Sequence, residues 1–414
     1  NTGATQVAVA GDLELVIVAE DLESVRGGAG ADTFVGNSLD NRFVVSGGGD
    51  SFDGMAGEDS VIAEGDADML LSDVALDVGG DVDGLISIEA AELTGGVSVN
   101  HLDASAFTGV AILTGEGGAD VLMGSVGGTT FEGGEGDDDL FGLGGNDRYL
   151  FDVDGVLGVD QIDDTGGGDT VDFAATTTVG VTVDLGVVGI VQTVHGSNLA
   201  LELSAGTVVE DLVGGEQADS LTGNAADNRI SGGFGADALD GGAGTNTLVE
   251  QRDADFVLTD SAVTIGAETD TLVNIGQAVF LGGESGNLID ASLFTLGAVL
   301  LNGGAGNDSI FGGAGDDFLF GGEGNDQLFG GHDSVTGPGT DNDLLSGGSG
   351  NDVYLIDLTD QQGADTIFEA ASGGAFDLIA GAGGSAVDLN SNAAQLLDAN
   401  LTLTLSNLNV EFSL

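Results

Sequence analysis

A nine-residue word, Gly-Gly-x-Gly-x-Asp-x-apolar-x, recurs in phase through this chain and limits its fold more than any other feature. Three copies follow one another without interruption, starting at Gly303, Gly312 and Gly321. Glycine at positions one, two and four allows the backbone to adopt positive φ and turn tightly. The apolar residue at position eight is expected to point inward from a short strand. A period of this kind predicts a parallel β-roll in which two words form one coil.

Four blocks keep this phase, at about residues 27–62, 115–150, 214–249 and 303–355. An insertion at about residues 332–341, which contains the only Pro, interrupts the fourth block. The segments between the blocks alternate apolar and polar residues with period two. They are therefore expected to form metal-free β-helical coils that join the blocks.

A longer repeat lies over the words. Ala67–Asp73 resembles Ala254–Asp260 at a shift of 187 residues. We therefore expect two tandem copies of one unit, residues 1–200 and 201–414, each with two blocks and their spacers. The expected fold class is all-β, an elongated right-handed parallel β-roll or β-solenoid.

The charge balance narrows the set of partners. The chain has 70 Asp and Glu against five Lys and Arg, which gives a formal net charge of −65. A compact chain of this charge repels itself, and it lacks the cations that bind nucleic acid phosphates or an anionic membrane surface. No apolar run reaches the roughly 18 residues of a membrane span, so no membrane insertion is expected. The carboxylates need cations from outside, and hard divalent ions such as Ca²⁺ prefer oxygen ligands.

Position six of each word supplies a carboxylate, which should lie above position six of the word one coil along. Each such pair would hold one Ca²⁺ together with carbonyl oxygens of the turns, so several ions are expected. The strongest pairs are Asp32 with Asp50, Asp120 with Asp138, Asp219 with Asp237, and Asp308 with Asp326. The full set of predicted calcium ligands is Asp32, Asp50, Asp59, Asp120, Asp138, Asp147, Asp219, Asp237, Asp308, Asp317, Asp326, Asp343 and Asp352.

Some pairs are weaker because they lack one or both charges. They are Asn41 with Asp59, Thr129 with Asp147, and Asn228 with Asn246. Asp227 is a candidate replacement carboxylate for the last pair, and the third block is expected to bind Ca²⁺ less tightly than the fourth. The alternative is a glycine-rich β-solenoid without metal, but facing carboxylates would then repel each other.

Three further groups of residues resemble parts of catalytic, metal or carbohydrate sites, but we expect each of them to have a structural role. His101, His195 and His332 are scattered along a chain without Cys, so they are expected at the surface or in turns. Asp81–Gly84 resembles part of an EF-hand loop, but the first and twelfth ligand positions do not fit. The aromatic residues at position eight are expected in the core rather than on a carbohydrate-binding surface: Phe34, Phe43, Phe52, Tyr149 and Tyr354.

The words also carry a resemblance to a known family. The chain resembles the RTX proteins, the haemolysin-type calcium-binding repeat family, through the words at Gly27, Gly133, Gly232, Gly303, Gly312, Gly321 and Gly347. The resemblance implies a secreted or cell-surface protein that is exported unfolded, commonly by type I secretion, and that folds in extracellular Ca²⁺.

These observations favour a calcium-stiffened segment of a fibre, surface layer or adhesin stalk, which self-associates head to tail into a homopolymer or lattice. No catalytic constellation is visible, so the chain is not expected to be an enzyme. One alternative is the RTX module of a larger secreted protease, lipase or polysaccharide-modifying enzyme whose catalytic domain lies outside this chain. Another is a glycan-binding adhesin with a cleft near His332. An upstream catalytic domain would favour the enzyme, and further copies of the 187-residue unit would favour the fibre.

Overall fold

The computed structural model describes residues 6–7, 14–16, 24–331, 342–357, 364–368, 377–382, 395–396, 402–406 and 410–412. These residues form strands, turns and bends but no helix, which confirms the expected all-β class. None of them belongs to an apolar helix long enough to cross a bilayer. The insertion at residues 332–341, with His332 and the glycan cleft expected near it, lies outside the described residues. The chain divides into two compact units, unit 1 (Asn1–Gln217) and unit 2 (Ala218–Leu414).

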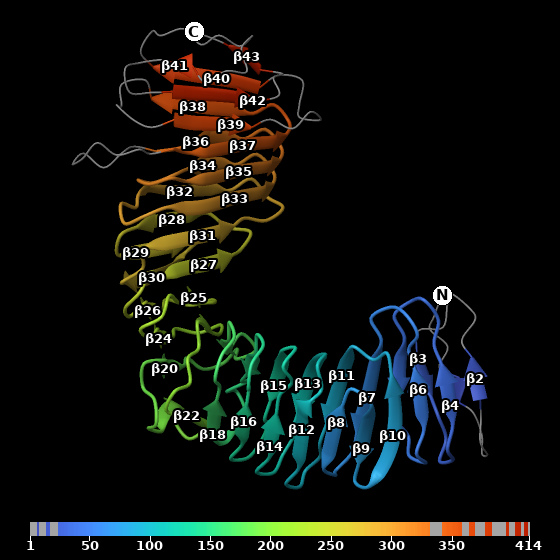
Figure 1. Ribbon diagram of the computed structural model, residues 1–414. Coiled ribbons are helices and arrows are strands. Elements are labelled where there is room, and N and C mark those ends of the chain that lie inside the picture. Colours follow the sequence, from blue (N-terminus) through green and yellow to red (C-terminus); the bar gives the residue numbers. More distant parts are fainter. Residues whose placement is uncertain are drawn as a thin grey trace. The chain divides into compact units, whose positions relative to one another are not determined.

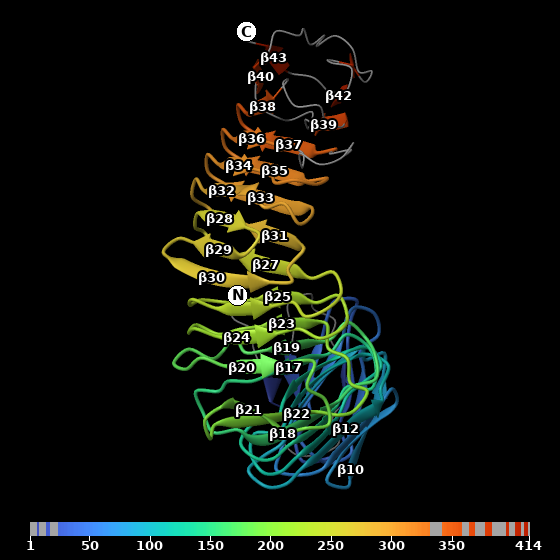
Figure 2. The ribbon, with the colours of Figure 1, turned by 90° about the vertical axis from the view of Figure 1, so that its left-hand side faces the viewer.

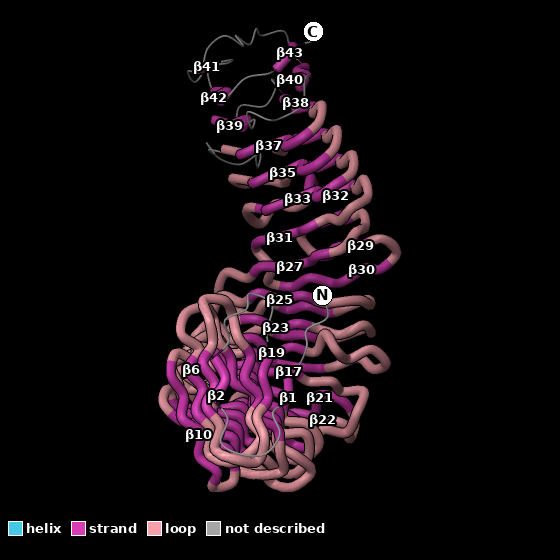
Figure 3. The backbone as a smooth tube through the Cα atoms, turned by 90° about the vertical axis from the view of Figure 1, so that its right-hand side faces the viewer, coloured by secondary structure: helices cyan, strands magenta, loops and turns pink. Residues whose placement is uncertain are grey.

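Each unit is a stack of coils, and each coil gives one short strand to each of two sides, which we call side A and side B (Figure 1). On side A, β3 (Ser24–Arg26) pairs in parallel with β5 (Arg42–Val44). On side B, β4 (Thr33–Val35) pairs in parallel with β6 (Ser51–Asp53). Both registers correspond to two words, which confirms the parallel β-roll. Figure 3 shows the loops and turns (pink) that join the described strands (magenta).

Unit 1 continues this order over both sides. Side A consists, in stacking order, of β1 (Gln6–Val7), β3, β5, β7 (Ser60–Glu64), β11 (Ala90–Thr94), β13 (Val110–Thr114), β15 (Thr129–Glu132), β17 (Arg148–Leu150), β19 (Thr170–Asp172) and β23 (Asp211–Val213). Side B consists of β2 (Glu14–Val16), β4, β6, β10 (Asp81–Ile86), β9 (Ala75–Val78), β8 (Met69–Ser72), β12 (His101–Ala106), β14 (Val121–Met123), β16 (Asp139–Phe141), β18 (Gly158–Asp163), β22 (Leu199–Leu203) and β21 (Gln192–His195). The short strand β20 (Thr182–Asp184) lies between β19 and β21 in the chain.

Unit 2 repeats the arrangement, and Figure 2 shows its side A strands β27 to β37 one above another. Side A consists of β25 (Arg229–Ser231), β27 (Thr247–Gln251), β31 (Gln277–Leu281), β33 (Val299–Ala305), β35 (Phe318–Glu323), β37 (Leu344–Ser349), β39 (Ala364–Phe368), β42 (Thr402–Ser406) and β41 (Gln395–Leu396). Side B consists of β24 (Ser220–Thr222), β26 (Ala238–Asp240), β30 (Glu268–Val273), β29 (Ala262–Ile265), β28 (Phe256–Thr259), β32 (Leu288–Leu293), β34 (Ser309–Phe311), β36 (Gln327–Phe329), β38 (Val353–Asp357), β40 (Asp377–Ala382) and β43 (Val410–Phe412).

A three-strand antiparallel insertion interrupts side B in each unit, and β21 at the end of side B in unit 1 also pairs antiparallel with β22. In unit 1, β9 pairs antiparallel with β8 on one side and with β10 on the other. The outer strands pair in parallel with the neighbouring coils, β10 with β6 and β8 with β12. In unit 2, β28, β29 and β30 do the same, each 187 residues after its counterpart. The sequence predicts only parallel coils here, which is wrong for these strands. Alternation with period two is common to parallel and antiparallel strands, and the reversal between β9 and β10 depends on Gly79 and Gly80, which both have positive φ.

The residues at position eight form the core of both units. The aromatic residues that were expected there are fully buried: Phe34, Phe43, Phe52, Tyr149 and Tyr354. The rings of Phe34 and Phe52 stack across one coil, with their centroids 5.4 Å apart. Because position eight is fixed in the core, the side chain at position six, two residues earlier, is held at the end of the turn.

Candidate metal sites

The side chains at position six stack from coil to coil in files. The backbone N–H of Asp308 donates to Oδ1 of Asp326, one coil along, at 2.8 Å. The other three strongest predicted pairs make the same contact at 2.8 Å: Asp32 with Asp50, Asp120 with Asp138, and Asp219 with Asp237. The structure thus brings all four pairs together, and their role as metal ligands stays a prediction.

The remaining predicted ligands lie on the same files. They accept a backbone N–H from the coil before at 2.6–2.9 Å: Asp59 from Asn41, Asp147 from Thr129, Asp317 from Val299, Asp343 from Asp317, and Asp352 from Asp326. The fourth block therefore keeps its stacking on both sides of the insertion.

In many carboxylates of these files, the second oxygen accepts no hydrogen bond from a described residue. Among the described residues, buried Oδ2 atoms without a hydrogen-bond partner belong to Asp50, Asp59, Asp83, Asp120, Asp138, Asp147, Asp169, Asp237, Asp308 and Asp326. A buried polar atom left unpaired costs about 1–3 kcal/mol, and more when it is charged. A repeated file of such oxygens indicates a ligand that binds to them.

The position-one glycine leaves the space that such a ligand needs. A Cβ on Gly321 would lie 2.3 Å from Oδ2 of Asp326 and 2.5 Å from the carbonyl oxygen of Gly347. A Cβ on Gly115 would likewise lie 2.5 Å from Oδ2 of Asp120 and 2.4 Å from a turn carbonyl oxygen. Carboxylate and carbonyl oxygens therefore converge on one small space. An all-oxygen donor set of this kind fits Ca²⁺.

The electrostatics of the files favour the binding of a cation. The pKa of Asp326 is raised to about 7 by burial, against the effect of the Asp308 N–H, and the carboxylates of Asp352 and Asp308 raise it further. The pKa of Asp237 is raised to about 8, again mainly by burial. A divalent cation favours the ionised form of each carboxylate, so it competes with protons for the same oxygens.

The third block is built differently on side A. The N–H of Asn228 donates to Oδ1 of Asn246 at 2.9 Å. The Asn246 Nδ2 then donates to the carbonyl oxygens of Asn274 at 2.9 Å and Ala243 at 3.2 Å. The Asn246 amide thus donates hydrogen bonds to carbonyl oxygens that would otherwise be available as ligands for a cation. Asp227 does not join this pair, since its carboxylate accepts a backbone N–H at 2.6 Å on the exposed side of the turn.

The files are longer than the sequence analysis predicted. Four further aspartates accept the N–H of a predicted ligand at 2.6–3.1 Å: Asp83 from Asp50, Asp160 from Asp138, Asp169 from Asp147, and Asp270 from Asp237. Their words keep the acid and the apolar residue two positions later but lack the glycine pair at positions one and two. The acid and the apolar residue two positions later are the signal that marks all four, including Asp83, which lies in the segment that resembles part of an EF-hand loop.

A cluster of carboxylates lies at the end of the second block. Asp147, Asp164 and Asp169 are buried, and one oxygen of each lies within 4.8 Å of the others. The pKa of Asp147 is raised to about 7 by burial and by the carboxylates of Asp164 and Asp169, although the Thr129 N–H opposes this. The pKa of Asp169 is raised to about 7, mainly by burial.

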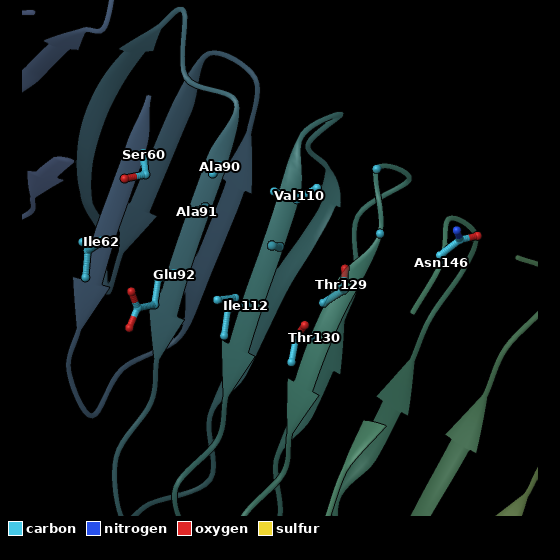
Figure 4. A pocket seen from close by; sticks show the side chains of 13 residues that line it. Ser60, Ile62, Ala90, Ala91, Glu92, Val110, Ile112, Thr129, Thr130 and Asn146 are labelled. Carbon is cyan, nitrogen blue, oxygen red and sulfur yellow. The ribbon is translucent and has the colours of Figure 1, made fainter. Parts of the chain in front are cut away.

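A groove of about 380 Å³ lies on side A of unit 1. Figure 4 shows side chains such as Ile62, Glu92, Ile112 and Thr130 along it, from β7, β11, β13 and β15. None of the described residues that line it is aromatic. The groove therefore lacks the flat ring surface that a sugar would stack on.

The comparisons with known proteins agree with the geometry of the files. The family model of the RTX calcium-binding nonapeptide repeat (4 copies) matches residues 24–43, 35–70, 114–149, 213–248, 300–328 and 329–355. These segments contain every predicted calcium ligand but not Asp83, Asp160, Asp164, Asp169 or Asp270. A search of curated proteins found no match.

Proposed function

Because the chain belongs to the RTX calcium-binding nonapeptide repeat family, we propose that it is an extracellular structural protein whose coils are held together by Ca²⁺. The observation that carries this proposal is the file of buried, unpaired second oxygens in both units, as at Asp120, Asp138, Asp308 and Asp326. Such sites combine few carboxylates with turn carbonyls, so their expected Ca²⁺ affinity is weak and matches the millimolar Ca²⁺ concentration outside cells. RTX repeats are typical of secreted proteins, which supports an extracellular or cell-surface location.

We propose that the chain is a segment of a fibre, surface layer or adhesin stalk. We propose no catalytic activity for it. The antiparallel insertion recurs after 187 residues, so a longer array needs only further copies of one unit. The edge of a coil offers backbone N–H and C=O groups that pair with another strand. A head-to-tail contact through such edges continues into filaments. A glycan-binding role has less support, because the groove on side A of unit 1 has no aromatic lining.

Electron microscopy and size-exclusion chromatography in millimolar Ca²⁺ and in EGTA test this proposal. We expect filaments or a lattice with Ca²⁺ and unassembled chains with EGTA. The double variant Asp308→Asn/Asp326→Asn should reduce assembly in Ca²⁺, while Asp227→Asn, a matched change at an exposed turn, should leave it unchanged. Short monodisperse particles in Ca²⁺ would rule out self-association. Unchanged circular dichroism in EGTA would rule out the stabilising role of the metal.

A further inference from the structure

We propose that Asp147, Asp164 and Asp169 form a separate three-carboxylate Ca²⁺ site, tighter than the sites of the regular words, which closes the coil after the second block. The proposal deepens the calcium-binding part of the proposed function and rests on it. It is independent of fibre formation. Two of the three residues, Asp164 and Asp169, lie outside the segments that match the repeat family.

The three carboxylates come from three consecutive parts of the chain. Asp147 directly precedes β17, Asp164 directly follows β18, and Asp169 directly precedes β19. The solvent-exposed fraction is 1% for Asp147 and 0% for both Asp164 and Asp169. One oxygen of each lies within 4.8 Å of the other two, a spacing that one hard cation can bridge.

Two oxygens of this cluster are left without a partner. Oδ1 of Asp147 accepts the N–H of Thr129 at 2.6 Å, and Oδ1 of Asp169 accepts the N–H of Asp147 at 3.0 Å. Among the described residues, the buried Oδ2 atoms of Asp147 and Asp169 have no hydrogen-bond partner. Buried polar atoms in native proteins are almost always satisfied. These oxygens therefore point to a bound cation.

Asp164 stands where the regular words have glycine. Counting back from Asp169 at position six, Asp164 is position one of its word. In the word of Asp147, position one is Gly142, and Oδ2 of Asp164 lies 2.4 Å from the point that a Cβ on Gly142 would occupy. A third carboxylate is thus placed in the room that this glycine leaves. Tyr149 donates its hydroxyl to Oδ2 of Asp164 at 2.6 Å, and the N–H of Gly166 donates to Oδ1 at 3.2 Å. A carboxylate oxygen retains a further lone pair for a metal.

No side-chain cation of the protein takes the place of the metal among the described contacts of this cluster. Arg148, the neighbour of Asp147 in sequence, is paired with Asp172 instead. Three carboxylates bring more negative charge than the two of a regular word, and ligand charge raises Ca²⁺ affinity. We therefore expect this site to be the last to lose Ca²⁺ as a chelator is added.

Terbium luminescence tests this proposal directly, because Tb³⁺ binds oxygen ligands and is sensitised by a nearby tyrosine. The chain has two Tyr and no Trp. In the variant Tyr354→Phe, Tyr149 is the single sensitiser, and its hydroxyl would lie about 5 Å from a cation on Asp164. Titration of this variant with Tb³⁺, followed by competition with Ca²⁺, should show one tight site with strong sensitised emission.

Asp164→Asn in the Tyr354→Phe background should weaken that site at least tenfold, because the amide keeps the acceptor for Tyr149 but removes the charge. Asp164→Gly restores the glycine of the regular word and should also weaken Tb³⁺ binding at this site. It serves as the second variant if Asp164→Asn does not fold. Asp227→Asn, at an exposed turn outside the carboxylate files, is the matched control and should leave the emission unchanged. Equal affinity in the Asp164 variants, or no sensitised emission in a chain that still binds Ca²⁺ by calorimetry, would overturn this proposal alone. A chain that binds no Ca²⁺ at all would overturn the proposed function as well.

Discussion

Each position of the word has one physical task, and the tasks depend on each other. The aspartate at position six uses one oxygen to accept an N–H from the coil before and leaves the other unpaired, as at Asp308 and Asp326. The glycine at position one keeps that second oxygen close to a carbonyl, as Gly321 shows. Loss of either residue should therefore affect metal binding more than it affects the strand.

The first prediction concerns Gly321→Ala. Its Cβ would lie 2.3 Å from Oδ2 of Asp326, so the carboxylate must move away from the carbonyl of Gly347. In EGTA we expect this crowding to cost about 1–3 kcal/mol of stability. In Ca²⁺ we expect a larger loss, because the carboxylate and carbonyl oxygens are also displaced from the metal; urea unfolding measures both. Gly276→Ala is the control, since nothing lies within 4 Å of a Cβ at Gly276. Equal losses with and without Ca²⁺ would contradict the assigned role of the glycine.

The first and third blocks, one from each tandem copy, differ at one position-six residue, which is Asp59 in the first copy and Asn246 in the second. Asn246 stands 187 residues after Asp59 and satisfies two carbonyls with its amide. Asn246→Asp removes this donor and adds a charge, so the variant should be less stable than the parent in EGTA. In Ca²⁺ the loss should be smaller, and the difference in melting temperature between Ca²⁺ and EGTA should increase. Thermal unfolding in both buffers measures this difference, and an unchanged difference would argue against metal binding at this turn.

At the scale of the strand and the coil, the stacking depends on a continuous inward file. The ring of Phe52 contacts the rings of Phe34 and Phe43, and each pair of ring centroids is 5.4 Å apart. Phe52→Ala should cost about 3–5 kcal/mol of unfolding free energy. Leu39→Ala in the same block, where the side chain is 47% exposed, should cost less than about 1 kcal/mol. Chemical denaturation in Ca²⁺ checks both values, and similar losses would mean that the ring stack does not hold the coils.

The sequence was sufficient to predict the parallel coils, their register and the inward position eight, because these follow from the period alone. The antiparallel strands β8–β10 could not be predicted, since their alternation also fits a parallel coil and only the pairing partner differs. The carboxylate file was predicted where glycine marks the turn, and its members Asp83, Asp160 and Asp270 were missed. At those positions the coil is longer, but the core residue two positions later still fixes the acid in place.

At the scale of the whole molecule, the excess of negative charge makes stability depend on both pH and metal. The pKa values of Asp147 and Asp326 are raised to about 7 and that of Asp237 to about 8, against about 3.9 in an unfolded chain. Without metal the folded state holds more protons between these values. Its stability therefore falls as pH rises from about 4 to 8. With Ca²⁺, which binds the ionised form, stability should instead rise with pH.

Urea unfolding at pH 5 and pH 7.5, each in EGTA and in Ca²⁺, measures these opposite slopes. We expect the metal-free protein to be more stable at pH 5 and the Ca²⁺-bound protein to be more stable at pH 7.5. Slopes of the same sign in both buffers would mean that the carboxylate files do not bind the metal.

The central claim is that Ca²⁺ lies between stacked carboxylates and joins one coil to the next. A high-resolution crystal structure from millimolar Ca²⁺, with anomalous difference density, tests it most directly. We predict a peak between the turns of Asp308 and Asp326, about 2.3–2.6 Å from their second oxygens and from turn carbonyls. Two well-ordered coils with no density in that gap would contradict the account.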